Sequence, residues 1–87
     1  MLSNSVKVTN EQGLHMRPAG LFAKEMGAFH CDVNIVFNDK KINAKSVMNI
    51  IAACIKCGSE ITIECDGEDE QAAMDKAMEL AENGFGE

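Results

Sequence analysis

A histidine, an arginine and a proline lie within four consecutive positions near the N-terminus, at His15, Arg17 and Pro18. Pro18 suits the first turn of a helix, where its missing N–H costs nothing. His15 is then expected at or just before the helix N-terminus, where backbone amides and the positive end of the helix dipole attract anions. A neutral imidazole nitrogen is a good nucleophile toward phosphorus, and an arginine fork binds phosphate oxygens. The spacing predicts a phosphoryl-carrying histidine; a histidine that only occupies a loop or cap is the alternative.

Four short stretches alternate apolar with polar residues, which is typical of strands with one buried and one wet face. They cover residues 5–9, 33–37, 40–44 and 61–65. Turn-forming pairs follow the second and the fourth stretch, at Asn38-Asp39 and at Asp66-Gly67. The chain therefore contains the strands of one four-stranded sheet.

Helical spacing of apolar residues predicts three helices. They cover residues 16–28, residues 47–54 and a final segment that starts at the acids 68–70 and ends before Asn83-Gly84. Helices that pack on the apolar face of the four strands give a two-layer α+β sandwich. The predicted element order is strand, helix, strand, strand, helix, strand, helix (βαββαβα), in a single domain over residues 1–87.

The net charge of −6 is unevenly distributed. Residues 60–87 contain ten acidic residues and one basic residue, whereas residues 1–59 contain four acidic and seven basic residues. The overall acidity argues against nucleic acid as the main partner, and the mildly basic half around His15 suits a phosphorylated or acidic protein partner. No apolar run reaches the length of a membrane span and no signal-peptide pattern is present, so we expect a cytoplasmic protein.

Ser46 precedes the second predicted helix, where a serine suits the N-cap. A phosphate on this hydroxyl would lie at a helix N-terminus and be tolerated there, and it would repel acidic groups of an incoming partner. Two interpretations of Ser46 therefore stay open, a structural cap and a site of regulatory phosphorylation.

Four cysteines occur, at Cys31, Cys54, Cys57 and Cys65. Cys54 and Cys57 form a CxxC pair, which raises a metal or redox function. A second CxxC or a paired histidine motif is missing, and Cys65 continues the apolar alternation of its strand, which favours a buried structural role. We therefore expect no metal and no cofactor, and we keep a metal or redox module as an alternative.

The stretch Gly13-Leu14-His15-Met16-Arg17-Pro18-Ala19 resembles the GLHxRPA active-centre motif of HPr, the histidine-containing phosphocarrier family of the bacterial phosphoenolpyruvate-dependent sugar phosphotransferase system. Lys45-Ser46-Val47-Met48 resembles the regulatory-serine segment of that family, and the ending Gly84-Phe85-Gly86-Glu87 is most similar to its Gram-positive members. The likeness extends over essentially the whole chain. It implies an open-faced sandwich in which one four-stranded antiparallel sheet is covered on one face by three helices.

The resemblance also implies a function for the motif residues. His15 is expected to accept a phosphoryl group from phosphorylated enzyme I and to pass it to the IIA domains of sugar permeases, while Arg17 stabilises the phosphate. Such a protein is a phosphoryl carrier, not an enzyme, and it is expected to be a monomer. Ser46 is the expected target of an HPr kinase/phosphorylase, and the product would act through a catabolite-control transcription regulator. The alternative is a mainly regulatory protein of carbon catabolite repression.

Partner docking is expected on exposed apolar residues beside the active centre, because methionine side chains adapt to several partner surfaces. The predicted docking residues are Met16, Gly20, Lys24, Val47, Met48 and Ile51. Phe22 is expected in the core, and Lys24 and Lys45 are expected to add positive potential near His15. Four residues differ from those common in the family. Small or hydroxyl residues are common at the positions of Met16 and Gly20, and glycine is common at those of Asn49 and Cys54. These differences affect partner surfaces and leave the chemistry of His15 and Arg17 intact.

Overall fold

The computed structural model describes residues 1–86, which form four strands, three α-helices and a short C-terminal 3-10 turn. The elements in chain order are β1 (Leu2–Lys7), α1 (Met16–Gly27), β2 (Asp32–Phe37), β3 (Lys40–Asn43), α2 (Val47–Ala52), β4 (Glu60–Asp66), α3 (Glu70–Glu82) and η1 (Gly84–Gly86). The predicted order of strands and helices is confirmed.

All neighbouring strands of the sheet are antiparallel, in the order β1-β4-β2-β3. β4 therefore lies between β1 and β2, and Ile63 pairs with Asn4 on one side and with Ile35 on the other. The outer face is polar, with Lys41 Nζ 3.2 Å from Glu64 Oε1. Alternation along the strands places the apolar residues on the opposite face.

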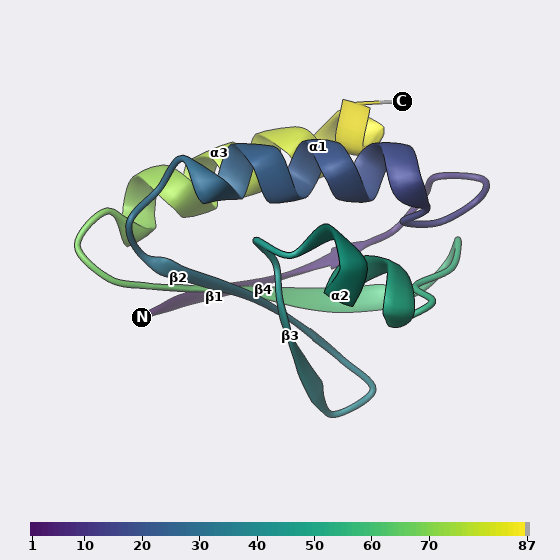
Figure 1. The fold of residues 1–87 in the computed structure, drawn as a ribbon, viewed down its shortest axis with the longest axis horizontal. Helices are drawn as coiled ribbons and strands as arrows, with labels where there is room; N and C mark the ends of the chain where they lie inside the picture. The colour runs from purple at the N-terminus through teal and green to yellow at the C-terminus, as the bar shows by residue number, and fades with distance from the viewer. Residues whose placement is uncertain (87) are drawn as a thin grey trace.

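The three helices cover that apolar face and leave the other face of the sheet open (Figure 1). The sheet contributes buried isoleucines and a valine to the core, α1 contributes Phe22 and Met26, and α2 contributes Ile50. Phe22 has no exposed surface, so its predicted place in the core is confirmed. The predicted open-faced α+β sandwich is therefore correct.

The C-terminal turn η1 lies beside the first half of α1 (Figure 1). The Phe85 ring meets the Phe22 ring edge to face, with the ring centroids 5.5 Å apart. The Asn10 side-chain amide donates a hydrogen bond to the Gly84 carbonyl, which ties the C-terminal turn to the loop between β1 and α1. Sequence periodicity did not predict the contact between Asn10 and Gly84, because neither of these two residues belongs to a regular strand or helix pattern.

Two elements, β1 and α2, differ from the predictions by two residues or more at an end, and most others differ by one residue. The first strand covers 2–7 where 5–9 was expected, because Val8 hydrogen-bonds with Gly58 and Ser59 in the loop that precedes β4. The second helix ends at Ala52 where 54 was expected, because Cys54 adopts a left-handed backbone conformation with φ of 56°. No helix in residues 1–86 is long and apolar enough to cross a membrane.

Candidate functional site

His15 is the N-cap residue of α1, as the position of Pro18 predicts. Its backbone is extended, with φ of −78° and ψ of −169°, and its carbonyl accepts the first helical hydrogen bond from the Ala19 N–H at 3.0 Å. The imidazole ring itself does not cap the amides of the first turn. The ring therefore lies at the positive end of the helix dipole and does not itself accept hydrogen bonds from these amides.

The backbone on both sides of His15 is anchored in the protein interior. Leu14 and Pro18 are buried, and the Leu14 N–H donates to the Ile55 carbonyl at 2.9 Å. Gly13 has φ of +68°, and a Cβ at this position would lie 2.2 Å from the Ile55 oxygen. Only glycine allows so close an approach of the two backbones. The loop is thus held in one place while its histidine remains half-buried.

A shallow depression beside the helix start is lined by Asn10, Glu11, Gln12, His15 and Arg17. Arg17 is exposed and lies in the first turn of α1, so the imidazole and the guanidinium border the same solvent-accessible space. Glu11 adds a carboxylate to the lining, and its negative charge disfavours an anion there. Arg17 and the N-terminus of α1 favour an anion. The arrangement places a ring nitrogen that can act as a nucleophile and a guanidinium that can bind phosphate oxygens beside the same space.

Asn10 is a site residue that sequence reasoning missed. It is 7% exposed and lines the depression, while its amide holds the Gly84 carbonyl of the C-terminal turn. The sequence places Asn10 at the start of a polar loop, which is ordinary for an asparagine. No local signal distinguishes an asparagine that faces solvent from one that joins two distant segments.

Ser46 is the N-cap residue of α2, so its predicted structural role is confirmed. Its backbone is extended, and its Oγ accepts a hydrogen bond from the Asn49 N–H at 3.3 Å. The side chain is half-buried. A phosphate on this oxygen would lie at the start of α2 and replace the hydroxyl as the cap.

The two lysines expected near His15 lie elsewhere. Lys45 Nζ donates to the Phe29 carbonyl at 2.8 Å, just beyond the C-terminal end of α1. His15 is at the other end of the same helix, so the expectation that Lys45 adds positive potential near His15 is wrong. Lys24 is exposed in the last turn of α1, about 14 Å along the helix axis from His15. Lys24 remains a predicted docking residue only.

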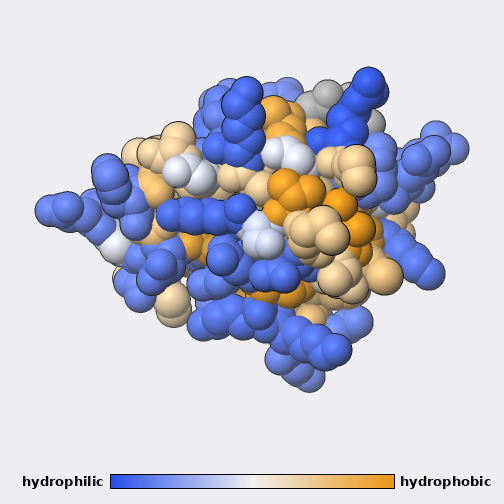
Figure 2. Space-filling model, viewed as in Figure 1, coloured by the Kyte–Doolittle hydropathy of each residue, from blue (hydrophilic) through white to orange (hydrophobic). Residues whose placement is uncertain are grey.

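The predicted docking residues lie on α1 and α2, which contact each other. Met16 and Met48 are 71% and 73% exposed. Val47, Ile51 and Gly20 are half-buried. Figure 2 shows hydrophobic side chains gathered over the region where α2 and the start of α1 lie. This surface, together with exposed Lys24, stays the predicted docking surface.

The cysteines form two groups, and all four are free thiols. Cys31 and Cys65 are buried, which confirms the expected core position of Cys65, whereas Cys54 and Cys57 are exposed. Burial raises the pKa of Cys31, and it raises the pKa of Cys65 to about 11. Within residues 1–86, no three His, Cys, Asp or Glu side chains are grouped so that they could hold a metal ion.

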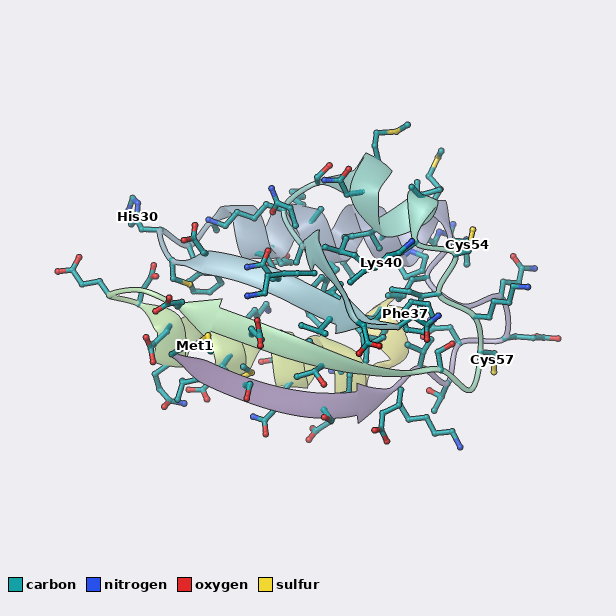
Figure 3. All side chains as sticks on the ribbon, turned by 90° about the horizontal axis from the view of Figure 1, so that it is seen from below. Met1, His30, Phe37, Lys40, Cys54 and Cys57 are labelled. Carbon is teal, nitrogen blue, oxygen red and sulfur yellow. The ribbon has the colours of Figure 1, made fainter. Side chains whose placement is uncertain are left out.

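Two carboxyl groups at the start of α3 have lowered pKa values. The backbone amides of His30 and Cys31 donate to Asp69, each at 2.8 Å, and the His30 amide is the main cause of the lowered pKa of Asp69. The Gly67 amide likewise lowers the pKa of Glu70. His30 is thus bound through its backbone and lies at the opposite end of α1 from His15 (Figure 3).

Comparison with known families identifies the chain. A model of the family described as PTS HPr component phosphorylation site matches residues 2–83. Phosphocarrier protein HPr of Mycoplasma capricolum is 45% identical over 74 residues, which cover 85% of this chain and 83% of the relative. The HPr-like protein Crh of Bacillus subtilis is 41% identical over 76 residues, with coverage of 87% and 89%.

Solved structures agree with the sequence comparison. HPr-C-His of Thermoanaerobacter tengcongensis superposes with a TM-score of 0.95 at 33% identity, covering 100% of this chain and 98% of that one. The mycoplasma histidine-containing phosphocarrier protein superposes with a TM-score of 0.91 at 38% identity, covering 97% of both chains. The overall fold therefore follows that of these proteins.

Proposed function

The chain belongs to the HPr family of phosphocarrier proteins, and we propose that its His15 accepts a phosphoryl group from phosphorylated enzyme I and donates it to IIA domains of sugar permeases. The observation that supports this most is the placement of His15 at the start of α1, bordering one open depression together with Arg17. A carrier of this kind is a covalently modified substrate of other proteins and performs no turnover of its own.

In the proposed transfer, a ring nitrogen of neutral His15 attacks the phosphorus atom with its lone pair. The bond between phosphorus and the donor breaks, and its electron pair stays with the donor protein. Arg17 and the backbone amides at the start of α1 stabilise the charge on the transferred group. The phosphorus–nitrogen bond that forms is labile, so the same group can leave toward the next acceptor.

Phosphoryl uptake by two histidine variants tests the assignment. Wild-type protein incubated with enzyme I and phosphoenolpyruvate is expected to gain one phosphate that is labile in acid and stable in alkali. His15→Ala is expected to gain none, and His30→Ala is the matched control, because His30 is the second histidine of the chain and lies at the other end of α1. Uptake by His15→Ala at the wild-type rate would contradict the proposal.

We further propose that an ATP-dependent HPr kinase/phosphorylase modifies Ser46 and that the product binds a catabolite-control transcription regulator. The position of Ser46 at the start of α2 supports this, because a phosphate is tolerated at a helix N-terminus. Incubation with the kinase and ATP is expected to give an acid-stable phosphate that Ser46→Ala does not acquire. Modification of another serine in the Ser46→Ala variant would contradict this assignment.

A mainly regulatory role is the second candidate, since the Crh protein of Bacillus subtilis is 41% identical to this chain. The presence of both His15 and Arg17 favours the carrier role, because regulation through Ser46 alone does not need a nucleophile beside a phosphate ligand. Absence of phosphate uptake from enzyme I, combined with normal modification of Ser46, would favour the regulatory role.

We also propose that the protein is cytoplasmic, as the resemblance to HPr implies, and that it works as a monomer, because both transfer steps require His15 to face a different partner in turn. Dimers are described for HPr of Thermoanaerobacter tengcongensis and for Crh of Bacillus subtilis. Light scattering over a concentration series is expected to give the mass of one chain, and a dimer that takes up phosphate at the same rate as the monomer would overturn this point.

A further inference from the structure

The exposed CxxC pair, Cys54 and Cys57, is left unexplained by the carrier function. Both thiols are free and exposed, so they contribute little to the packed core. Figure 3 shows both side chains at the same end of the molecule, on the segment that follows α2. Buried Cys31 and Cys65 account for the apolar use of cysteine in this chain, and Cys54 and Cys57 need another reason.

The CxxC pair lies on the segment that holds the loop in front of His15. We call residues 54–59 the clamp segment and residues 8–15 the His15 loop. The Leu14 N–H donates to the Ile55 carbonyl at 2.9 Å, and Val8 exchanges hydrogen bonds with Gly58 at 2.7 Å and with Ser59 at 2.8 Å. The clamp segment therefore supports the His15 loop at both ends.

The thiol of Cys57 takes part in this support. Its Sγ donates to the Thr9 carbonyl in the His15 loop at 3.7 Å. Cys54 stands at the other end of the CxxC, in the left-handed conformation with φ of 56° that a residue other than glycine adopts only at a cost. Ile55, which bonds Leu14, lies between the two cysteines in the chain. Any change that joins the two thiols thus acts on the residue that positions the backbone before His15.

We propose that Cys54 and Cys57 form a reversible dithiol–disulfide site whose oxidation releases Leu14 from Ile55 and slows phosphoryl transfer at His15. This inference rests on the proposed function for its effect on phosphoryl transfer, and on the hydrogen bonds of the clamp segment for its structural part. In a reducing compartment such a pair stays open and closes only under oxidative conditions.

The oxidation is balanced when a low-molecular-weight disulfide supplies the oxidant. One cysteine thiolate attacks that reagent and releases its first thiol, and the second cysteine then attacks the mixed disulfide and releases the second thiol. One S–S bond breaks and one forms, the two cysteines lose two electrons and two protons, and the reagent is reduced to two thiols. Closing the ring brings the sulfurs to about 2 Å, which takes Cys57 Sγ away from the Thr9 carbonyl.

A metal site is the less favourable use of the same pair. Two thiolates are half of the four ligands that a structural zinc requires. Over the described range 1–86, no third His, Cys, Asp or Glu joins them in a group that could hold a metal ion. The redox interpretation needs only the two thiols that are present.

The test uses the full chain with oxidised and reduced glutathione. After oxidation, peptide mapping by mass spectrometry is expected to find a bond between Cys54 and Cys57, with Cys31 and Cys65 still reduced. Hydrogen exchange is expected to be faster at the Leu14 amide in the oxidised form than in the reduced form. Phosphoryl uptake from enzyme I is expected to slow on the order of tenfold to a hundredfold, since a shift of about 1 Å in a reacting group has effects of this size. Reductant should restore the rate.

Two variants separate this site from the rest of the molecule. Cys54→Ser and Cys57→Ser are expected to fold, to take up phosphate when reduced and to lose the response to oxidised glutathione. Slowing of uptake in either variant on oxidation, a map with only mixed disulfides or a Cys31–Cys65 bond, or a Cys54–Cys57 bond with unchanged exchange at Leu14 would each overturn the inference. If the reduced wild-type chain takes up no phosphate, the proposed function fails, while the map and the Leu14 exchange still decide the structural part.

Discussion

The helices α1 and α2 both begin beside a residue that a phosphate is proposed to modify, but the two helix starts are built differently. At α2, the Ser46 hydroxyl accepts the Asn49 N–H, so the modifiable oxygen is already the cap. At α1, the His15 ring does not itself cap the amides of the first turn, and it borders an open depression with Arg17. A phosphate at Ser46 would replace the hydroxyl that now caps the helix, whereas a phosphate at His15 would add negative charge at a helix start that the ring itself does not cap.

The two starts also differ in what anchors them. The residue before His15 is hydrogen-bonded to Ile55, forty-one positions along the chain, whereas the backbone amide of Ser46 is bonded to nearby Asn43. The first anchor depends on tertiary structure and the second on a local turn. This difference fits the proposed roles, because a transfer site at His15 would require a fixed nucleophile, whereas a regulatory site at Ser46 would only have to be reached by a kinase.

The largest effect is expected from Gly13→Ala. Its Cβ would lie 2.2 Å from the Ile55 carbonyl oxygen in a backbone with φ of +68°, so the His15 loop must move away from the clamp segment. We expect phosphoryl uptake to fall on the order of a hundredfold, as displacement of a reacting group does. The free energy of unfolding should fall by about 2 kcal/mol, a typical cost of overpacking. Uptake at the wild-type rate would show that the anchor before His15 is dispensable.

Arg17→Ala is expected to slow uptake by roughly tenfold to a hundredfold, because it removes the guanidinium that we propose stabilises the phosphate. Arg17→Lys should recover only part of the rate, since an ammonium lacks the planar fork. Arg17 is exposed, so urea unfolding should stay within about 0.5 kcal/mol of wild type. Lys7→Ala is the control for loss of a surface cation, and an equal slowing in that variant would argue against a specific role of Arg17.

A third helix start gives a pH prediction. The His30 amide, with that of Cys31, lowers the pKa of Asp69 below its usual range, so the native state binds a proton at Asp69 less tightly than the unfolded chain. This stabilisation is complete above the ordinary carboxyl range, about pH 4 to 5, and is lost as the pH falls through the lowered pKa. The difference in unfolding free energy between wild type and Asp69→Asn should be constant near neutral pH and shrink toward pH 3.

If the difference in unfolding free energy between wild type and Asp69→Asn stays constant down to pH 3, the cause assigned to the lowered pKa of Asp69 is wrong. Urea unfolding at a series of pH values measures it. Glu70 also has a lowered pKa, so it contributes to the pH dependence of the wild-type stability as well. The difference in unfolding free energy between wild type and Asp69→Asn isolates the contribution of Asp69.

Ser46→Ala is expected to lower the free energy of unfolding by about 1 kcal/mol, the usual cost of removing an N-cap side chain. Ser46→Asp keeps a capping oxygen and should recover most of this loss. Urea denaturation of the three proteins measures both effects. Equal stability of Ser46→Ala and wild type would mean that the hydroxyl at the start of α2 is not used as a cap, and the contrast between the two helix starts would then disappear.

The smallest effect is expected from Gly20→Ala, and its sign is opposite. Gly20 lies inside α1, and a Cβ there meets nothing within 4 Å, so the change removes a flexible residue from a helix without a clash. A gain of up to about 1 kcal/mol in unfolding free energy is expected. A loss of stability would indicate a contact at α1 that the backbone geometry does not reveal. Gly13→Ala and Gly20→Ala together distinguish the effect of moving the His15 loop from the effect of a substitution within α1.

The sequence alone determined the order of the elements, the two-layer sandwich and the position of His15 at a helix start. Those features follow from local patterns, namely alternation along strands, apolar spacing along helices and a proline in the first turn. Ser46 as a cap and Phe22 in the core were predictable for the same reason. The motif around His15 indicated the HPr family, to which the chain belongs, and the proposed role of His15 follows from that family.

Only the tertiary structure decided which distant groups meet. Asn10 holds the Gly84 carbonyl, Ile55 holds the Leu14 amide, and Lys45 reaches Phe29 at the wrong end of α1 for the role expected of it. Each of these contacts joins segments with no shared local pattern. Periodicity reports which face of an element is apolar, and it carries no information on which loop an amide or an ammonium group will reach once the layers have packed.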